Sequence, residues 1–143
     1  MPRQPPSEGT TERVWRAMFD FLMRSAPMRS RALADRGLTP NDSRALFSLD
    51  VDQGRSMRSL ADAWECDPSN ATWIVDRLEK LGLAERRALP NDRRVKLVAL
   101  TLKGQRTRVA LLKAFHQPPA ELAALDAEDL QALDRVLAKL MVK

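Results

Sequence analysis

The side chains best suited to chemistry lie in one stretch of the sequence, between residues 67 and 94. Asp67-Pro68 opens this stretch, and the residues that follow include Ser69, Asn70, Thr72, Trp73 and Arg77. A later turn carries Asp92, Arg93 and Arg94. Hydroxyl, amide and guanidinium groups are the donors and acceptors that proteins use against base edges and phosphate oxygens. The stretch therefore predicts a surface that binds nucleic acid.

Two helices and a hairpin are expected to position these side chains. Ser56 starts a short helix, and residues 67–81 form a second one that Gly82 ends. Only Glu65 and Cys66 separate the two helices cleanly, which is typical of a helix-turn-helix. Residues 83–88 and 95–100 are short strands on either side of a turn that contains Pro-Asn-Asp. A helix-turn-helix places one helix in the DNA major groove, and a basic hairpin beside it can reach the backbone or the minor groove.

Positive charge is concentrated in the same region. The chain carries +5 overall, whereas residues 84–108 alone hold eight basic residues against two acidic ones. Charge gathered on a hairpin and the next helix favours a polyanionic partner. A solvated basic face is the alternative, and the adjacent helix-turn-helix favours the polyanion. Arg86 and Arg87 alternate faces along a strand, so at most one of them is expected to point at DNA.

Helices on both sides of this region are expected to pair two subunits. From Thr10 the spacing is helical and apolar on two faces, one with Val14 and Phe21, the other with Trp15 and Phe19. Pro27 is expected to kink or interrupt this helix. Near the C-terminus, leucines recur at 3-4-3 spacing, at Leu130, Leu133, Leu137 and Leu140. Residues 1–9 are predicted to form a disordered arm. The fold class is mainly α, a winged helix-turn-helix with a small β-hairpin wing and N- and C-terminal dimerisation helices.

Several classes of protein are not indicated. No catalytic motif, phosphate-binding loop, metal-ligand spacing or cofactor site is recognisable, so an enzyme is not expected. His116 is the only histidine, and a C-terminal helix cap explains it. No apolar run approaches the roughly 18 residues of a membrane span, and no secretory signal is visible. Because Cys66 is the only cysteine, nothing points to an oxidising compartment, and a cytoplasmic protein is expected.

The chain resembles the MarR family of bacterial transcriptional regulators. The resemblance covers nearly everything from Thr10 to the C-terminus and is specific because several short motifs occur together in order. These are residues 37–40 (GLTP), 59–61 (SLA), 67–72 (DPSNAT), 75–79 (VDRLE), 82–83 (GL), 90–94 (PNDRR), 100–104 (LTLKG) and 125–130 (LDAEDL).

The resemblance implies a single domain over residues 10–143 that binds double-stranded DNA as a homodimer. Residues 10–36 and 101–143 would dimerise, and residues 39–100 would form the winged helix-turn-helix. Such proteins are usually repressors of a pseudo-palindromic operator and are released by a small-molecule effector. The recognition helix would span residues 69–77. Asp92 would brace Arg93 or Arg94 as that arginine enters the minor groove.

Alternatives remain open at three places. Trp73 stands where the family commonly has arginine or glycine, and it either contacts DNA or packs within the domain. Trp15, Phe19 and Phe47 either line an effector cleft between the dimerisation helices and the winged domain or belong to the core. Cys66 precedes a helix, where a thiolate would be stabilised, so it is either a redox sensor or a small apolar residue that fills the turn. A winged helix that binds another protein is the alternative to DNA binding.

Overall fold

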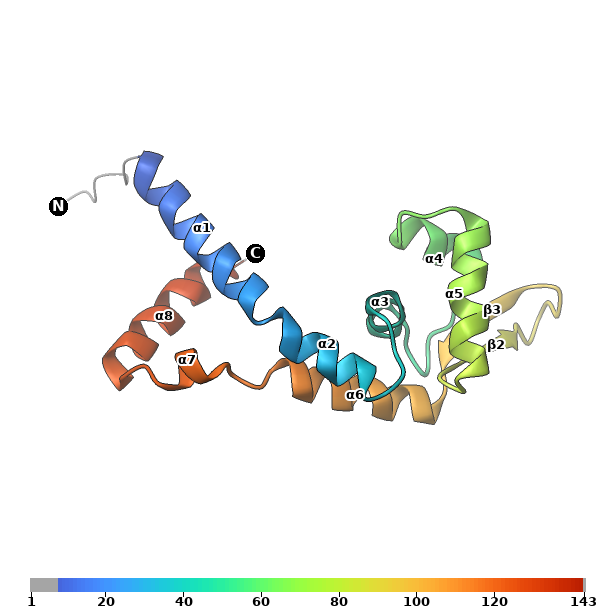
Figure 1. The fold of residues 1–143 in the computed structure, drawn as a ribbon. Helices are drawn as coiled ribbons and strands as arrows, with labels where there is room; N and C mark the ends of the chain where they lie inside the picture. Colours follow the sequence, from blue (N-terminus) through green and yellow to red (C-terminus); the bar gives the residue numbers. More distant parts are fainter. Residues whose placement is uncertain (1–7, 143) are drawn as a thin grey trace.

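The computed structural model describes residues 8–142 as a chain of helices with one small sheet (Figure 1). The helices are α1 (Glu8–Arg24), α2 (Ala26–Ala34), α3 (Pro40–Ser48), α4 (Met57–Ala63), α5 (Pro68–Lys80), α6 (Leu102–Phe115), α7 (Ala120–Ala123) and α8 (Ala127–Leu140). The strands are β1 (Arg55–Ser56), β2 (Ala84–Ala88) and β3 (Lys96–Leu100). The mainly α fold class with a small β wing is confirmed.

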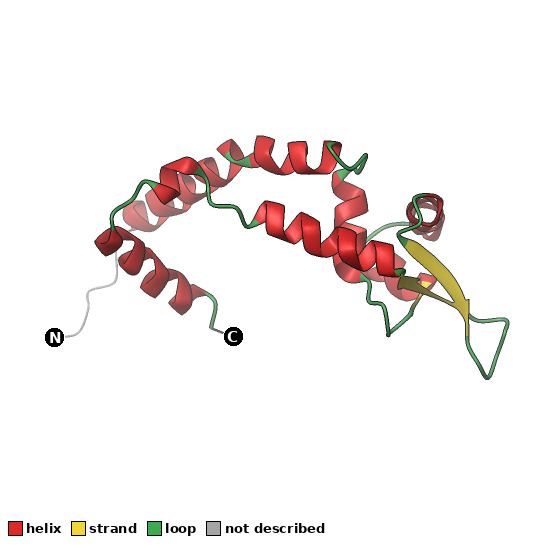
Figure 2. Ribbon diagram, turned by 90° about the horizontal axis from the view of Figure 1, so that it is seen from below, coloured by secondary structure: helices red, strands yellow, loops and turns green. Residues whose placement is uncertain are grey.

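The molecule is elongated, with a winged lobe at one end and an arm at the other (Figures 1 and 2). The winged lobe holds α3, α4, α5 and the sheet, and its wing projects from the molecule. Helices α2 and α6 lie side by side and connect this lobe to the arm, which holds α1, α7 and α8. The predicted dimerisation segments, residues 10–36 and 101–143, therefore include both the arm and the two helices that connect it to the winged lobe.

Helix starts follow the capping residues of the sequence. Thr39 and Asp42 form a capping box at α3, in which each side chain accepts a backbone N–H of the other residue. Ser56, Thr101 and Asp126 likewise accept a backbone N–H at the starts of α4, α6 and α8. The predicted start at Ser56 is confirmed.

The sheet is antiparallel with the order β1-β3-β2. In the hairpin, Ala84 pairs with Leu100 and Ala88 pairs with Lys96. The two predicted strands are confirmed with slightly later starts. Strand β1 pairs Arg55 with Val98 and was not predicted. The core lies between α3, α4, α5 and the sheet and extends to α2 and α6 through Leu33 and Leu111. Its largest completely buried side chains include Leu46, Leu60, Leu78, Leu100 and Leu111.

The N-terminal helices differ from one expectation and confirm another. The predicted disordered arm covers residues 1–9, of which residues 1–7 lie outside the described part of the chain; Glu8 and Gly9 belong to α1, so the helix starts before Thr10. The predicted first helix is interrupted, because α1 ends at Arg24 and Pro27 lies in the first turn of α2. None of the helices in residues 8–142 is long and apolar enough to cross a membrane.

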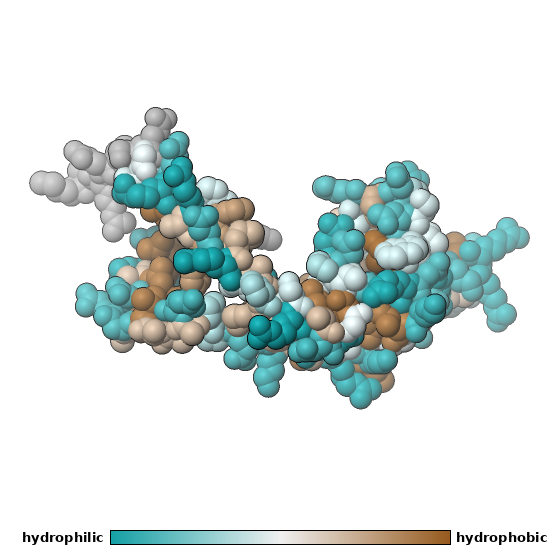
Figure 3. Space-filling view, viewed as in Figure 1, coloured by the Kyte–Doolittle hydropathy of each residue, from teal (hydrophilic) through white to brown (hydrophobic). Residues whose placement is uncertain are grey.

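Apolar side chains remain exposed along the arm. On α1 they include Val14, Trp15, Phe19 and Leu22, and α8 has no buried residue although Leu133 and Leu137 lie on it. Figure 3 shows apolar surface over both helices in the space-filling view. No other described part of the chain covers these apolar side chains of α1 and α8. A second surface would be needed to remove them from water.

Candidate nucleic-acid interface

Helices α4 and α5 are joined by a short turn that the backbone itself closes. The Cys66 N–H donates to the Ala61 carbonyl, and Glu65 adopts a left-handed conformation with φ of 51°. Trp64 is buried beneath the turn, and its indole N–H donates to the Ser48 hydroxyl at 2.9 Å. Arg44 of α3 donates to the Trp64 carbonyl at 3.0 Å. The turn is thus fixed to α3, and the angle between α4 and α5 is held by the core.

Helix α5 has one buried face and one exposed face. The buried face packs on the core through Ala71, Ile74, Val75 and Leu78. The exposed face carries Ser69, Asn70, Thr72 and Trp73. The alternative that Trp73 packs within the domain does not fit, because 59% of its surface is exposed. Four of the five predicted recognition-helix residues therefore share one solvent-facing surface.

Arg77 forms its contacts within the domain. Its guanidinium Nε lies 3.0 Å from the carboxylate of Asp42, and Nη2 donates to the Gly37 carbonyl at 3.1 Å. Asp42 is 1% exposed and also caps α3. An ion pair with so buried a carboxylate engages the arginine inside the domain. The structure therefore has Arg77 fasten α5 to the start of α3, and a contact of Arg77 with a DNA phosphate stays a prediction.

Arg86 fastens the wing to helix α5. Its guanidinium donates to Asp76 at 2.8 Å and also bonds to Glu79, and both carboxylates belong to α5. Burial alone would lower the pKa of Arg86, but the hydrogen bonds and charges of Asp76 and Glu79 outweigh burial and raise it. Arg87 turns the other way and donates to the Val51 carbonyl at 2.6 Å. Both strand arginines thus hold the lobe together.

The wing tip presents two arginines to solvent. Arg93 and Arg94 are exposed, and neither forms an ion pair within the described part of the chain. The Asp92 carboxylate accepts the backbone N–H of Arg94 at 3.0 Å, so it orders the turn. The predicted bracing of an arginine side chain by Asp92 is not present, since the carboxylate contacts the backbone of Arg94 and not its guanidinium. Both guanidinium groups are available to a partner.

The basic side chains of residues 84–108 therefore do not form one continuous surface that is available to a partner. Arg86, Arg87 and Arg108 are engaged in contacts within the lobe, Arg108 through the Leu49 carbonyl. Arg93, Arg94 and Lys96 belong to the wing, whereas Lys103 and Arg106 lie on α6. The sequence could locate this charge, but it could not show which of these groups are engaged within the lobe. That depends on distant partners such as the Val51 carbonyl, which is 36 residues from Arg87.

The three candidate effector residues do not share one cavity. Trp15 and Phe19 lie together on α1, with ring centroids 6.5 Å apart beside a shallow surface depression. Phe47 of α3 instead packs edge-on against Phe115 of α6 at 5.9 Å. The alternative that Trp15 is a core residue is wrong for the single chain, in which 64% of it is exposed. Cys66 is partly buried and packs against the core.

Comparison with known proteins agrees with this architecture. The model of the MarR family matches residues 38–96. The transcriptional repressor MprA of Escherichia coli is 32% identical over 116 residues, which cover 79% of this chain and 66% of that protein, just under two thirds of its length.

Two solved structures share the fold. The YusO protein of Bacillus subtilis superimposes with a TM-score of 0.77 at 24% identity, covering 95% of this chain and 97% of that one. A complex of S. aureus MepR with DNA superimposes with a TM-score of 0.64 at 20% identity, covering 87% of this chain and 99% of that one. The family model assigns residues 38–96 of the chain to the MarR family, and the similarity to MprA and the shared winged fold agree with that assignment.

Proposed function

We propose that this protein is a transcriptional regulator that binds a pseudo-palindromic DNA operator as a homodimer and represses transcription. The observation that carries the proposal is the common exposure of the α5 face and the wing tip. Ser69, Asn70, Thr72 and Trp73 are free to meet a major groove, and Arg93 and Arg94 project beside them. The similarity to a named repressor, MprA, supports the same role.

Base reading is assigned to the N-terminal half of α5. The Asn70 amide offers both a donor and an acceptor to a base edge, and the indole face of Trp73 suits a thymine methyl or a sugar. Thr72 donates its hydroxyl proton to the Pro68 carbonyl at 2.9 Å, so its oxygen is left as an acceptor. The wing arginines would enter the flanking minor groove, where the potential is most negative. Phosphate neutralisation then makes binding salt-dependent.

Dimerisation is assigned to the arm. The exposed apolar side chains of α1 and α8 are covered if two chains pair there. Such a pair would set two recognition helices at a fixed spacing of about 34 Å for successive major grooves. An effector that changes this spacing would weaken DNA binding by shifting the dimer between two states. Release by a small molecule is thus part of the proposal.

The wing arginines provide the test. In a duplex-binding assay over a range of salt, the double variant Arg93→Ala/Arg94→Ala should bind more weakly and with a shallower salt slope, by up to about 4 for the dimer. The control Arg31→Ala/Lys113→Ala removes the same charge from exposed positions on α2 and α6 and should leave the slope nearly unchanged. Equal affinity of both variants and the unaltered protein would refute DNA binding through the wing and favour a protein-interaction module.

A further inference from the structure

The two halves of α5 differ in the charge of their side chains. The N-terminal half, residues 68–74, contains no basic residue. The basic residues of the helix, Arg77 and Lys80, both lie in its last turn. Lys80 follows Asn70 by ten residues, which is about 15 Å along the helix axis. The amide of Asn70 therefore approaches DNA without a cation of α5 beside it.

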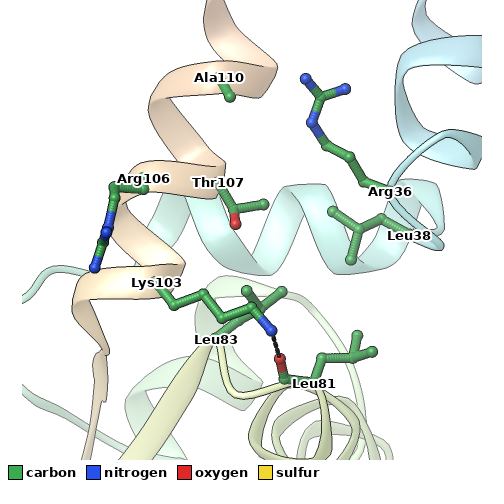
Figure 4. A pocket seen from close by; sticks show the side chains of 8 residues that line it. All are labelled: Arg36, Leu38, Leu81, Leu83, Lys103, Arg106, Thr107 and Ala110. Atoms are coloured by element: carbon green, nitrogen blue, oxygen red, sulfur yellow. Dashed lines mark hydrogen bonds between the residues drawn. The ribbon is translucent and has the colours of Figure 1, made fainter.

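The C-terminal half of α5 is engaged with other parts of the winged lobe. Arg77 pairs with the buried carboxylate of Asp42 at 3.0 Å. Just beyond the end of the helix, the Leu81 carbonyl accepts a hydrogen bond of 2.9 Å from Lys103 of α6 (Figure 4). These contacts hold the C-terminal half against α3 and α6, so the N-terminal half is the part that is free to contact bases.

Asn70 is free to hydrogen-bond to a base. Its side chain is exposed and forms no hydrogen bond within residues 8–142. A side-chain amide has an acceptor oxygen and two N–H donors. This pair matches the N6 amino group and the N7 acceptor that adenine presents in the major groove. Adenine is therefore the base that Asn70 is best equipped to recognise.

Trp73 lies one helical turn after Asn70 on the same face of α5. Three residues separate them, which is about 4.5 Å along the helix axis, whereas successive bases on one DNA strand are about 3.4 Å apart. The Trp73 ring is 59% exposed and presents apolar surface to solvent. The 5-methyl group of thymine is the apolar group that base edges offer in the major groove. The two side chains are thus spaced to contact neighbouring base pairs.

The charges around Asn70 disfavour guanine. Guanine presents two acceptors, O6 and N7, which are most often read by arginine or lysine. The charged residues that line the same surface depression as Asn70 are Asp62, Glu65 and Asp67, all acidic. Asp67 stands at the N-cap of α5, yet its carboxylate accepts no backbone N–H of the helix. A carboxylate has no proton to donate to guanine, so this end of α5 is poorly suited to that base.

We propose that α5 reads A·T base pairs in each half of the operator. Asn70 forms two hydrogen bonds to an adenine, and Trp73 contacts the 5-methyl group of a thymine in a neighbouring pair. The inference rests on the proposed function, because it names the bases that the same surface selects. The wing, which is assigned to the minor groove, does not reach either of these major-groove groups.

The test uses duplexes enriched from a random pool, in which single base atoms are then removed. Uracil in place of the half-site thymines removes only the 5-methyl groups and should weaken binding about fourfold for each half-site. Replacing the half-site adenines by 7-deazaadenine removes the N7 acceptor and should weaken binding about tenfold for each half-site. Both changes lie in the major groove, so contacts of the wing with the minor groove are preserved.

Two variants serve as controls for each other. Trp73→Ala should lose its response to uracil and keep its response to 7-deazaadenine, and Asn70→Ala should do the reverse. Enriched half-sites made of G·C pairs, or unaltered affinity for both modified duplexes, would overturn this inference while DNA binding stands. Enrichment of no duplex at all would overturn the proposed function and this inference with it. If a variant is misfolded by circular dichroism, the modified duplexes with the unaltered protein still decide.

Discussion

At the scale of single residues, Arg77 shows how burial changes the meaning of a sequence pattern. As part of a recognition helix it predicts a phosphate contact, yet its guanidinium meets Asp42, which is almost completely buried. The signal for this pair is weak in the sequence, because Asp42 serves equally well as a helix-capping residue. Trp73 is the reverse case, since the structure favours the functional interpretation by leaving the ring exposed.

Removing the Arg77 guanidinium should cost stability. In Arg77→Gln the Asp42 carboxylate stays buried without its counter-charge, and we expect a loss of about 3 kcal/mol in the free energy of unfolding. Urea denaturation monitored by circular dichroism measures this loss. Arg31→Gln, at an exposed position on α2, is the control and should change stability by less than about 0.5 kcal/mol. If Arg77→Gln left the stability unchanged but weakened DNA binding, Arg77 would instead act by contacting a DNA phosphate.

Cys66 is expected to be a packing residue. It is partly buried against the core, and its N–H closes the turn between α4 and α5. We therefore expect peroxide to leave the DNA affinity of the protein unchanged, and Cys66→Ser to respond as the unaltered protein does. Fluorescence anisotropy of labelled duplex DNA with and without peroxide makes the comparison. Release of DNA by peroxide that is absent in Cys66→Ser would establish a redox switch instead.

At the scale of elements, the sequence predicts those features that depend on residues close together in the chain, such as helix starts. The starts of α3, α4, α6 and α8 follow from capping residues whose partners lie three residues away. Strand β1 has only two residues and α7 only four, too short for a periodic pattern to reveal them. The interruption between α1 and α2 was expected from Pro27.

The junction of α6 with the wing depends on a glycine. A Cβ at Gly104 would lie 1.9 Å from the Leu83 carbonyl oxygen, a backbone atom that cannot move freely. Gly104→Ala should therefore destabilise the fold by about 2 kcal/mol or more, as overpacking does. Gly9→Ala is the matched control, because nothing lies within 4 Å of its Cβ position on α1. Thermal unfolding of both variants checks this, and equal midpoints would show that the junction can relax.

At the scale of the whole molecule, the separation of the winged lobe from the arm implies two tasks. The lobe holds a complete core, whereas the arm leaves the apolar faces of α1 and α8 exposed (Figure 1). The sequence predicted these apolar stripes, but it could not tell the core of one chain from a surface between two chains, because both give the same periodicity. Trp15 and Phe19 illustrate this, being apolar, helical and exposed.

A charged substitution on α8 tests whether two chains pair through the arm. Leu133→Glu should convert a dimer to monomers at micromolar concentration, because a carboxylate would be buried in an apolar contact. Gln131→Glu adds the same charge at a neighbouring exposed position and should leave the dimer intact. Sedimentation velocity distinguishes the two species. A dimer that survives Leu133→Glu would place the subunit contact elsewhere.

The measurement that most directly tests the central claim is selection from a pool of random duplex DNA, followed by sequencing, at two salt concentrations. We predict a palindrome whose half-sites lie about one helical turn apart and whose enrichment falls as salt rises. The same selection with Arg93→Ala/Arg94→Ala should lose preference in the flanks of that palindrome while keeping its centre. Absence of any DNA binding at low salt would contradict the account and favour a winged helix that binds protein.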